Sequence, residues 1–253
     1  MPTKHLDWFD TFVAGFNTGE PVHDEHIGLK REHSLKVLAE AEAVAGGIGL
    51  PPELLRTCRL AALYHDAGRF PQYATYGTFK DRDSTDHALL GVRTLRRHGA
   101  LAGEDAGTRA LVLGAVAMHN RRVVPARLST GLDTVTRVVR DADKLDIVRI
   151  MLGHMGPEGK HSDVVLLSVS DDPERYTEAI VDQVRAGRIG DYALMRYEND
   201  FKLLMLSWVF DLNFRPARRA FLERGFAGSL FGLLPRTPEL TALEDRIYDH
   251  LNS

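Results

Sequence analysis

One helical stretch of the chain ends in an imidazole and a carboxylate side by side. Apolar residues recur at helical spacing as far as Ala62, and His65 continues the same face with Asp66 next to it. Gly68 and Pro71 follow directly, and we expect them to stop the helix. A nitrogen donor and an oxygen donor at the inner end of a buried helix are suitable ligands for a divalent cation. A cation site here needs further donors from elsewhere in the chain.

The composition of the chain indicates a globular protein and argues against several kinds of partner. The 253 residues are 44% hydrophobic, which is enough for the core of one large domain. The net charge of −3 favours neither nucleic acid nor an anionic membrane surface as a partner. The single cysteine, Cys58, rules out an internal disulfide framework and suits a reducing cytoplasm.

The sequence predicts neither secretion nor a membrane span. The N-terminal residues carry charges among their apolar side chains, unlike a signal peptide. The longest apolar run, 203–210, is interrupted by Ser207 and is far shorter than the roughly 20 residues that a span requires. We therefore expect a cytoplasmic protein.

Helical periodicity covers most of the chain and predicts an all-α fold. The expected helices are 6–17, 24–45, 51–66, a segment capped by Ser84, a segment through 112–119, 133–152, 173–186, 192–212, 216–224 and 238–251. The expected loops are 69–83, 99–108 and 153–163, the last of them holding His154 and His161. The run 164–169 is too short to assign.

Six polar side chains occupy inward positions on five successive predicted helices. They are His33, His65, Asp66, His87, His119 and Asp143. A polar side chain in an apolar stripe needs a partner, and an ionised carboxylate is especially costly there without one. Helical bundles satisfy such groups around pairs of metal ions. Gly91, one turn after His87, would let another helix approach closely.

The six side chains divide into two sets of donors. One cation would be held by His33, His65, Asp66 and Asp143. His87 and His119 would hold a second cation, with Asp66 bridging the two. Two metal ions about 3.5–4 Å apart can activate water at neutral pH and clamp a phosphoryl group. The alternative is a single cation, with His87 and His119 binding substrate or supporting the ligands.

The order of these motifs resembles the HD superfamily of metal-dependent phosphohydrolases. The signature of that superfamily is a histidine, then a His-Asp pair, then a distant aspartate. In this chain the signature residues are His33, His65-Asp66 and Asp143. The context of Asp143, residues 142–145, is similar to the last motif and favours Asp143 over Asp141 as the ligand. The resemblance covers about residues 26–150.

The resemblance implies an HD-domain helical bundle with additional C-terminal helices. Residues 1–253 would form a single domain, with a metal-binding core at about 26–150 and a helical extension at about 151–253. His87 and His119 are similar to the extra ligands of the dinuclear branch, which includes the HD-GYP cyclic-dinucleotide phosphodiesterases. The same ligand order also occurs in the di-iron HD oxygenases.

Two departures from the family pattern bear on the substrate. The chain has no Gly-Tyr-Pro signature, and no His-His pair follows His119. Arg69 also stands where many members carry lysine. Cyclic di-GMP is therefore a poor candidate substrate.

Basic residues near the expected ligands are candidates for the reaction itself. Arg69, Arg121 and Arg122 are placed to bind a substrate phosphate bidentately. The adjacent Arg121 and Arg122 cannot both point inward. Arg69 is the best candidate of the three, because it lies just past the His65-Asp66 pair. Lys144 is either catalytic or paired with a neighbouring acid. The candidate catalytic residues are therefore Asp66, Arg69 and Lys144.

The sequence predicts a hydrolase of phosphate esters, either monoesters or diesters, that acts on a small nucleotide or other phosphorylated metabolite. The cofactor would be one or two ions of Mn, Fe, Ni, Co or Zn, since mixed imidazole and carboxylate ligands do not select sharply among them. Two alternatives fit the same ligands: a di-iron oxygenase of the HD superfamily, and a non-catalytic metal or nucleotide sensor. The expected partner is a small phosphorylated molecule, with neither nucleic acid nor a membrane.

Overall fold

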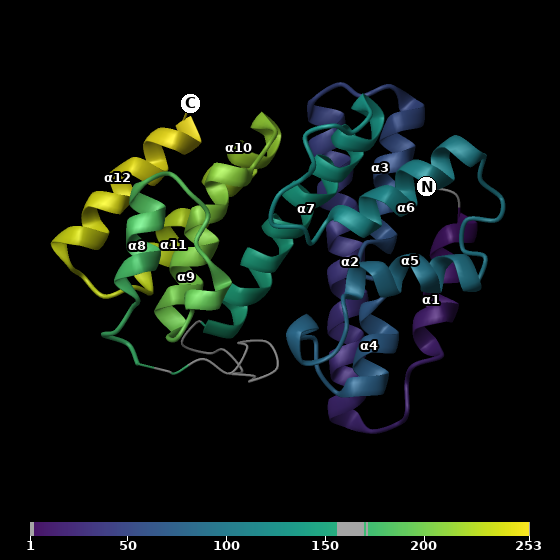
Figure 1. Ribbon diagram of the computed structural model, residues 1–253, viewed down its shortest axis with the longest axis horizontal. Helices are drawn as coiled ribbons and strands as arrows, with labels where there is room; N and C mark the ends of the chain where they lie inside the picture. The colour runs from purple at the N-terminus through teal and green to yellow at the C-terminus, as the bar shows by residue number, and fades with distance from the viewer. Residues whose placement is uncertain (1–2, 156–169, 171, 253) are drawn as a thin grey trace. The chain divides into compact units, whose positions relative to one another are not determined.

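The structure is a computed structural model that describes residues 3–155, 170 and 172–252. These residues form helices and no strand, which confirms the predicted all-α class. The chain divides into two compact units, Met1–Asp143 and Lys144–Ser253 (Figure 1). The expectation of one domain with a core at about 26–150 stays a prediction.

The first unit is built from long helices joined by short turns. Its elements are α1 (Thr3–Ala14), α2 (Pro21–Gly47), α3 (Pro52–Tyr64), α4 (Arg69–Tyr76), a short 3-10 helix η1 (Asp81–Asp83), α5 (His87–Arg97), α6 (Ala106–Met118) and the first half of α7 (Thr130–Met155). Helices α2 and α3 lie side by side, α3 and α5 both pack on α6, and α4 contacts α2 and α5 (Figure 1).

The second unit surrounds one buried helix. Its elements after α7 are α8 (Glu178–Arg185), η2 (Tyr192–Leu194), α9 (Glu198–Ser207), η3 (Trp208–Asp211), α10 (Arg215–Glu223), α11 (Phe226–Gly232) and α12 (Pro238–Asn252). Every residue of α9 is buried, including Glu198 and Lys202, whose charged groups lie 3.0 Å apart. Helices α8 and α11 both pack against α9.

The apolar stripes of the first unit confirm the predicted inward faces. On α2 the buried side chains include His33, Val37 and Ala41. On α6 they include Val112 and Val116, and His119 directly after the helix is buried as well. The helical spacing of three and four residues thus carries the histidines into the core with the aliphatic side chains.

The predicted loop at 69–83 is wrong, because α4 occupies most of it. Pro71 lies in the first turn of α4, where its missing N–H costs no intrahelical hydrogen bond. The predicted cap at Ser84 is also wrong. Asp86 is the N-cap of α5, and its carboxylate accepts the backbone N–H groups of Ala88 and Leu89 at 3.0 and 3.1 Å.

Several helices of the C-terminal part differ from the helices predicted from the sequence. The expected helix 192–212 is broken into η2, α9 and η3, because the Asp200 carboxylate accepts the N–H groups of Arg196 and Tyr197 and starts a new helix there. Helix 173–186 shrinks to α8, and α11 was not predicted. His154 lies in α7 instead of a loop, while His161 and the run 164–169 fall outside the described residues.

Among the helices that the structure describes, none has both the length and the apolar composition to cross a membrane.

The backbones of Gly68 and Gly91 lie close together beside the His-Asp pair. A methyl group built on Gly68 would lie 2.0 Å from the His87 carbonyl oxygen and 2.5 Å from the Gly91 nitrogen. Both neighbours are backbone atoms and cannot rotate away. The contact confirms the close approach expected at Gly91 and brings the start of α5 against the turn that follows α3.

We predict that Gly68→Ala lowers the free energy of unfolding by about 2–3 kcal/mol, because overpacking here has to displace backbone. Urea denaturation measures the loss. Gly28→Ala in α2 is the control, since a methyl group there meets nothing within 4 Å. It should stabilise the protein by about 0.5–1 kcal/mol through helix propensity. Equal effects of the two substitutions would contradict the packing argument.

A second buried cluster fixes α1 to α3. Glu104 accepts two hydrogen bonds from Arg56 at 2.6 and 2.8 Å and lies 2.9 Å from Nε2 of His5. Nδ1 of His5 lies 2.9 Å from the hydroxyl of Tyr64 at the end of α3. The hydrogen bonds from Arg56 contribute most to lowering the pKa of Glu104 from 4.5 to about 2.

We predict that Glu104→Gln lowers the free energy of unfolding at pH 7 by about 2 kcal/mol, because charged hydrogen bonds are lost. A depressed folded-state pKa stabilises the protein above the ordinary pKa, and the contribution is lost as pH falls toward about 2. The wild type and the variant should therefore converge between pH 5 and 2 in urea denaturation. Glu42→Gln, at a more exposed ion pair, should cost less than about 1 kcal/mol. A difference that stays constant down to pH 2 would refute the assignment.

Candidate metal centre

His65 and Asp66 lie in the turn between α3 and α4. His65 is the C-cap residue of α3, and the backbone then turns through hydrogen bonds from Ala67 N to Tyr64 O and from Arg69 N to Asp66 O. The side chains of His65 and Asp66 are both buried in this turn. The turn thus aims both donors into the interior of the first unit.

The histidine rings are fixed through their Nδ1 atoms. Nδ1 of His65 donates to the carbonyl of Ala62 at 2.8 Å, and Nδ1 of His119 donates to that of Val116 at 2.8 Å. These carbonyls belong to the last turns of α3 and α6, where the helix itself offers no partner. Because a carbonyl only accepts, Nδ1 carries the proton, and Nε2 of each neutral ring keeps a lone pair.

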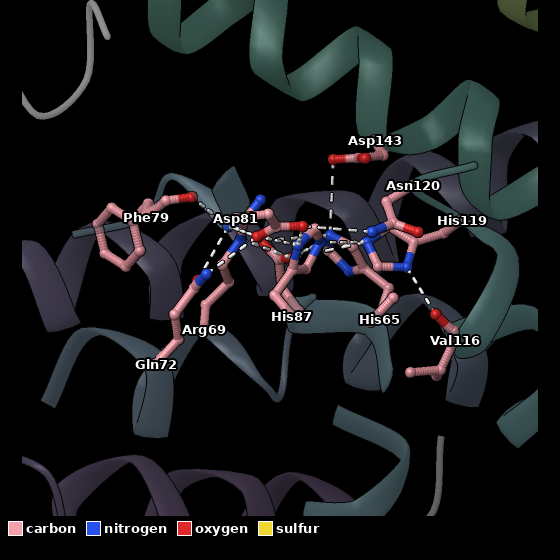
Figure 2. Close-up of polar contacts among 12 residues, drawn as sticks. His65, Arg69, Gln72, Phe79, Asp81, His87, Val116, His119, Asn120 and Asp143 are labelled. Atoms are coloured by element: carbon pink, nitrogen blue, oxygen red, sulfur yellow. Dashed lines mark hydrogen bonds and ion pairs between the residues drawn. The ribbon is translucent and has the colours of Figure 1, made fainter. Parts of the chain in front are cut away.

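His87 is fixed in the same way by a carboxylate. Its Nδ1 lies 2.8 and 2.7 Å from the two oxygens of Asp81, so Nδ1 donates and Nε2 faces the centre. Figure 2 shows the rings of His65, His87 and His119 close together, with Asp143 approaching from α7.

The Nε2 atoms face one another in pairs. Nε2 of His65 lies 3.3 Å from that of His33, and Nε2 of His87 lies 3.0 Å from that of His119. Nδ1 donates in His65, His87 and His119, so the Nε2 atoms of His87 and His119 are both unprotonated and repel each other unless a cation lies between them. The chemistry of the donor set therefore fits a divalent cation at each pair.

The two oxygens of Asp66 divide between the pairs. Oδ2 lies 3.6 and 3.7 Å from Nε2 of His33 and His65. Oδ1 lies 3.4 and 3.7 Å from Nε2 of His87 and His119. A carboxylate placed in this way could supply one oxygen to each of two ions.

Asp143 adds a carboxylate to one pair only. Its Oδ1 lies 3.1 Å from Nε2 of His33 and 3.5 Å from Nε2 of His65. The donor atoms form two groups, His33-His65-Asp143 and His65-Asp66-His119. Within each group all donor atoms lie within 4.8 Å of one another. We call His33, His65, Asp143 and Oδ2 of Asp66 the A half of the centre. We call His87, His119 and Oδ1 of Asp66 the B half.

The carboxylates at the centre are ionised. Burial by itself raises the pKa of Asp66, yet Lys30 and His65 bring it well below its ordinary value. Burial also opposes ionisation of Asp143, but the adjacent imidazoles of His33 and His65 lower its pKa well below the usual range. The centre therefore presents fixed negative charge to a cation.

The comparisons with known proteins identify this part of the chain. Residues 31–148 match the sequence model of the HD domain family. This segment is an HD domain. The superfamily consists mostly of metal-dependent hydrolases, and its domains bind divalent metals. Searches among curated proteins and among solved structures each gave no match.

The HD domain brings together all six side chains expected from the sequence, although their role as ligands stays a prediction. Arg69 also lies there: its Nε is 3.5 Å from Oδ1 of Asp66, and its Nη1 donates to Gln72, Asp81 and the carbonyl of Phe79. The guanidinium thus lies between two carboxylates, within reach of the B half.

The other predicted basic residues lie apart from the ligand atoms. Arg121 is exposed and lies 3.4 Å from the Asp86 carboxylate, and Arg122 is exposed beside it. The ammonium of Lys144 lies 2.6 Å from the carboxylate of Asp211 in the second unit. Substrate binding by the arginines and catalysis by Lys144 stay predictions.

Sequence reasoning missed Lys30, although its spacing offered a signal. The residue precedes His33 by one helical turn on α2, and its ammonium lies 2.8 Å from Oδ2 of Asp66. Residues three apart on a helix share a face. A lysine at that spacing from an inward histidine therefore points toward the same centre.

Arg140 and Asp81 were also missed. Arg140, one turn before Asp143 on α7, donates to the carbonyl of His119 at 2.9 Å and to that of Arg121. It ties the end of α6 to α7. Asp81 lies in the segment where the sequence showed no period, so only the folded chain reveals its contact with His87.

We predict that His65→Ala and Asp66→Ala each abolish metal retention, because Asp66 supplies one oxygen to each half and His65 belongs to both groups of donor atoms that lie within 4.8 Å. Elemental analysis of freshly purified protein measures the equivalents of metal, and circular dichroism checks that the variants fold. His98→Ala and Asp83→Ala, at exposed positions of the same unit, should leave the metal content unchanged. Two full equivalents in Asp66→Ala would rule out the bridging role.

Proposed function

We propose that the protein is a metal-dependent phosphohydrolase that acts on a small phosphorylated metabolite or nucleotide, as a monoesterase or diesterase. The observation that carries the proposal is the placement of the two Asp66 oxygens, one on each pair of histidine nitrogens, with cationic side chains beside them. A site of this kind favours a substrate that brings negative charge to bound metal ions.

The donor set would hold one or two ions of Mn, Fe, Ni, Co or Zn, the A half through His33, His65, Asp143 and Asp66, and the B half through His87, His119 and Asp66. Bound there, the ions would act as Lewis acids toward water and toward a phosphoryl oxygen.

Lys30 and Arg69 supply the positive charge that a phosphoryl group needs around it. The side chain of Lys30 is 18% exposed and that of Arg69 is 16% exposed, so both reach toward solvent from the Asp66 carboxylate. Lys30 lies on the A side of Asp66 and Arg69 on the B side. A phosphoryl group between them would have its charge matched from both sides.

Metal analysis paired with a substrate panel tests the proposal. Freshly purified protein is assayed for bound metals and incubated with phosphomonoesters and phosphodiesters in the presence of each candidate metal. We expect phosphate ester hydrolysis that a chelator abolishes and that Asp66→Ala lacks. Bound iron together with oxygen uptake on an organic substrate would instead support the di-iron oxygenase. A panel that stays intact with every metal would support the sensor.

We predict that Lys30→Met lowers kcat/KM by about tenfold or more while the metal content stays full, since a charged hydrogen bond to the phosphoryl group is lost. Steady-state kinetics and elemental analysis measure the two quantities. Lys36→Met, at an exposed position of the same helix, is the matched control and should be unaffected. Unchanged kcat/KM in Lys30→Met, or loss of metal from it, would contradict a role in substrate binding.

A further inference from the structure

The B half has fewer negatively charged donor atoms than the A half. The A half has two carboxylate donors, from Asp143 and from Oδ2 of Asp66. The B half has only Oδ1 of Asp66, and the Nε of Arg69 lies 3.5 Å from that oxygen. A cation in the B half therefore meets less negative charge and a nearby positive group.

Asp81 supplies the missing charge through His87. Both of its oxygens lie within 2.8 Å of Nδ1 of His87, and Oδ1 also accepts a hydrogen bond from Arg69 at 3.0 Å. A carboxylate on Nδ1 fixes the tautomer and raises the basicity of the opposite nitrogen. The same carboxylate partly neutralises the arginine that would repel a cation.

The position of Asp81 is itself determined by several elements. Gln72 of α4 donates to its Oδ1 at 2.9 Å, and Asn120, just after α6, lies 3.4 Å from its Oδ2. Gln72 is fully buried, and its amide also donates to Ser84 Oγ and to the carbonyl of Thr85 at 2.8 and 3.0 Å. The carboxylate is thus held in place by side chains of the protein itself (Figure 2).

His87 is held differently from its partner His119. Backbone carbonyls fix the rings of His65 and His119, and no side-chain substitution removes these acceptors. A side chain fixes the ring of His87. Substitution at one position can therefore release this ligand and leave the A half intact.

We propose that Asp81 is the positioning residue of the B half: it holds His87 with Nε2 toward the second cation and determines whether that cation is retained. This inference rests on the proposed two-cation centre and names the side chain on which its second ion depends. In this role Asp81 acts through Nδ1 of His87.

The test uses Mn²⁺ alone as the probe, with the full chain. Equilibrium titration followed by electron paramagnetic resonance counts the ions and detects magnetic coupling between them. We expect two coupled ions in the wild type. Asp81→Ala should keep one ion at unchanged affinity and bind the second about 10–100-fold more weakly, with the coupling lost. Asp81→Asn keeps an acceptor for Nδ1 and should recover part of the second affinity.

A spectroscopic readout separates positioning from general damage. In metal-free protein, long-range ¹H–¹⁵N spectra report which ring nitrogen of His87 carries the proton. We expect Nδ1–H in the wild type and a mixture of tautomers in Asp81→Ala. Asp83→Ala removes an exposed acid from the same 3-10 helix and should change neither the spectra nor the titration.

The outcomes distinguish this inference from the proposed function. If Asp81→Ala binds both ions with wild-type affinity, the inference fails and the two-cation phosphohydrolase stands. A wild type that binds a single Mn²⁺ overturns the two-cation centre and this inference with it. A variant that loses both ions shows a structural role for Asp81 and also overturns the inference.

Discussion

Buried nitrogen lone pairs that face one another set the main constraint on the HD domain. The Nε2 atoms of His87 and His119 lie 3.0 Å apart in the core, and those of His33 and His65 lie 3.3 Å apart. Nδ1 of His65, His87 and His119 donates a hydrogen bond in each case, so the Nε2 atoms of His87 and His119 are both acceptors and cannot bond to each other. Positive charge between them removes the repulsion, which is why the interior favours metal ions.

The helical framework places these nitrogens in the core because most of the candidate ligands lie at helix ends. His65 and His119 follow the last residues of α3 and α6, and His87 is the first residue of α5. At the C-terminal ends, free carbonyls three residues earlier accept the ring N–H and orient the side chain. The contact between Gly68 and Gly91 then brings α5 against the turn that carries the carboxylate.

Much of this could be predicted from the sequence, because the helical period is local. The spacing of His33 and Val37, or of Val116 and His119, places each histidine on an apolar face whatever the rest of the chain does. The failures have equally local causes. The sequence predicts that Pro71 helps to stop a helix, whereas this proline lies in the first turn of α4. In the second unit, the Asp200 carboxylate ends one helical segment and starts another.

The sequence by itself determined the all-α class, the HD signature and the six inward donors, since each follows from residue type and helical spacing. Only the tertiary structure decided which Asp66 oxygen faces which histidines, and that Asp81, Lys30 and Arg140 lie around the centre. These contacts join residues from α2, α5, α7 and the segments that follow α3, α4 and α6, far apart in the chain. Periodicity reports the face of a helix on which a side chain lies, but the atom it meets depends on how separate helices pack.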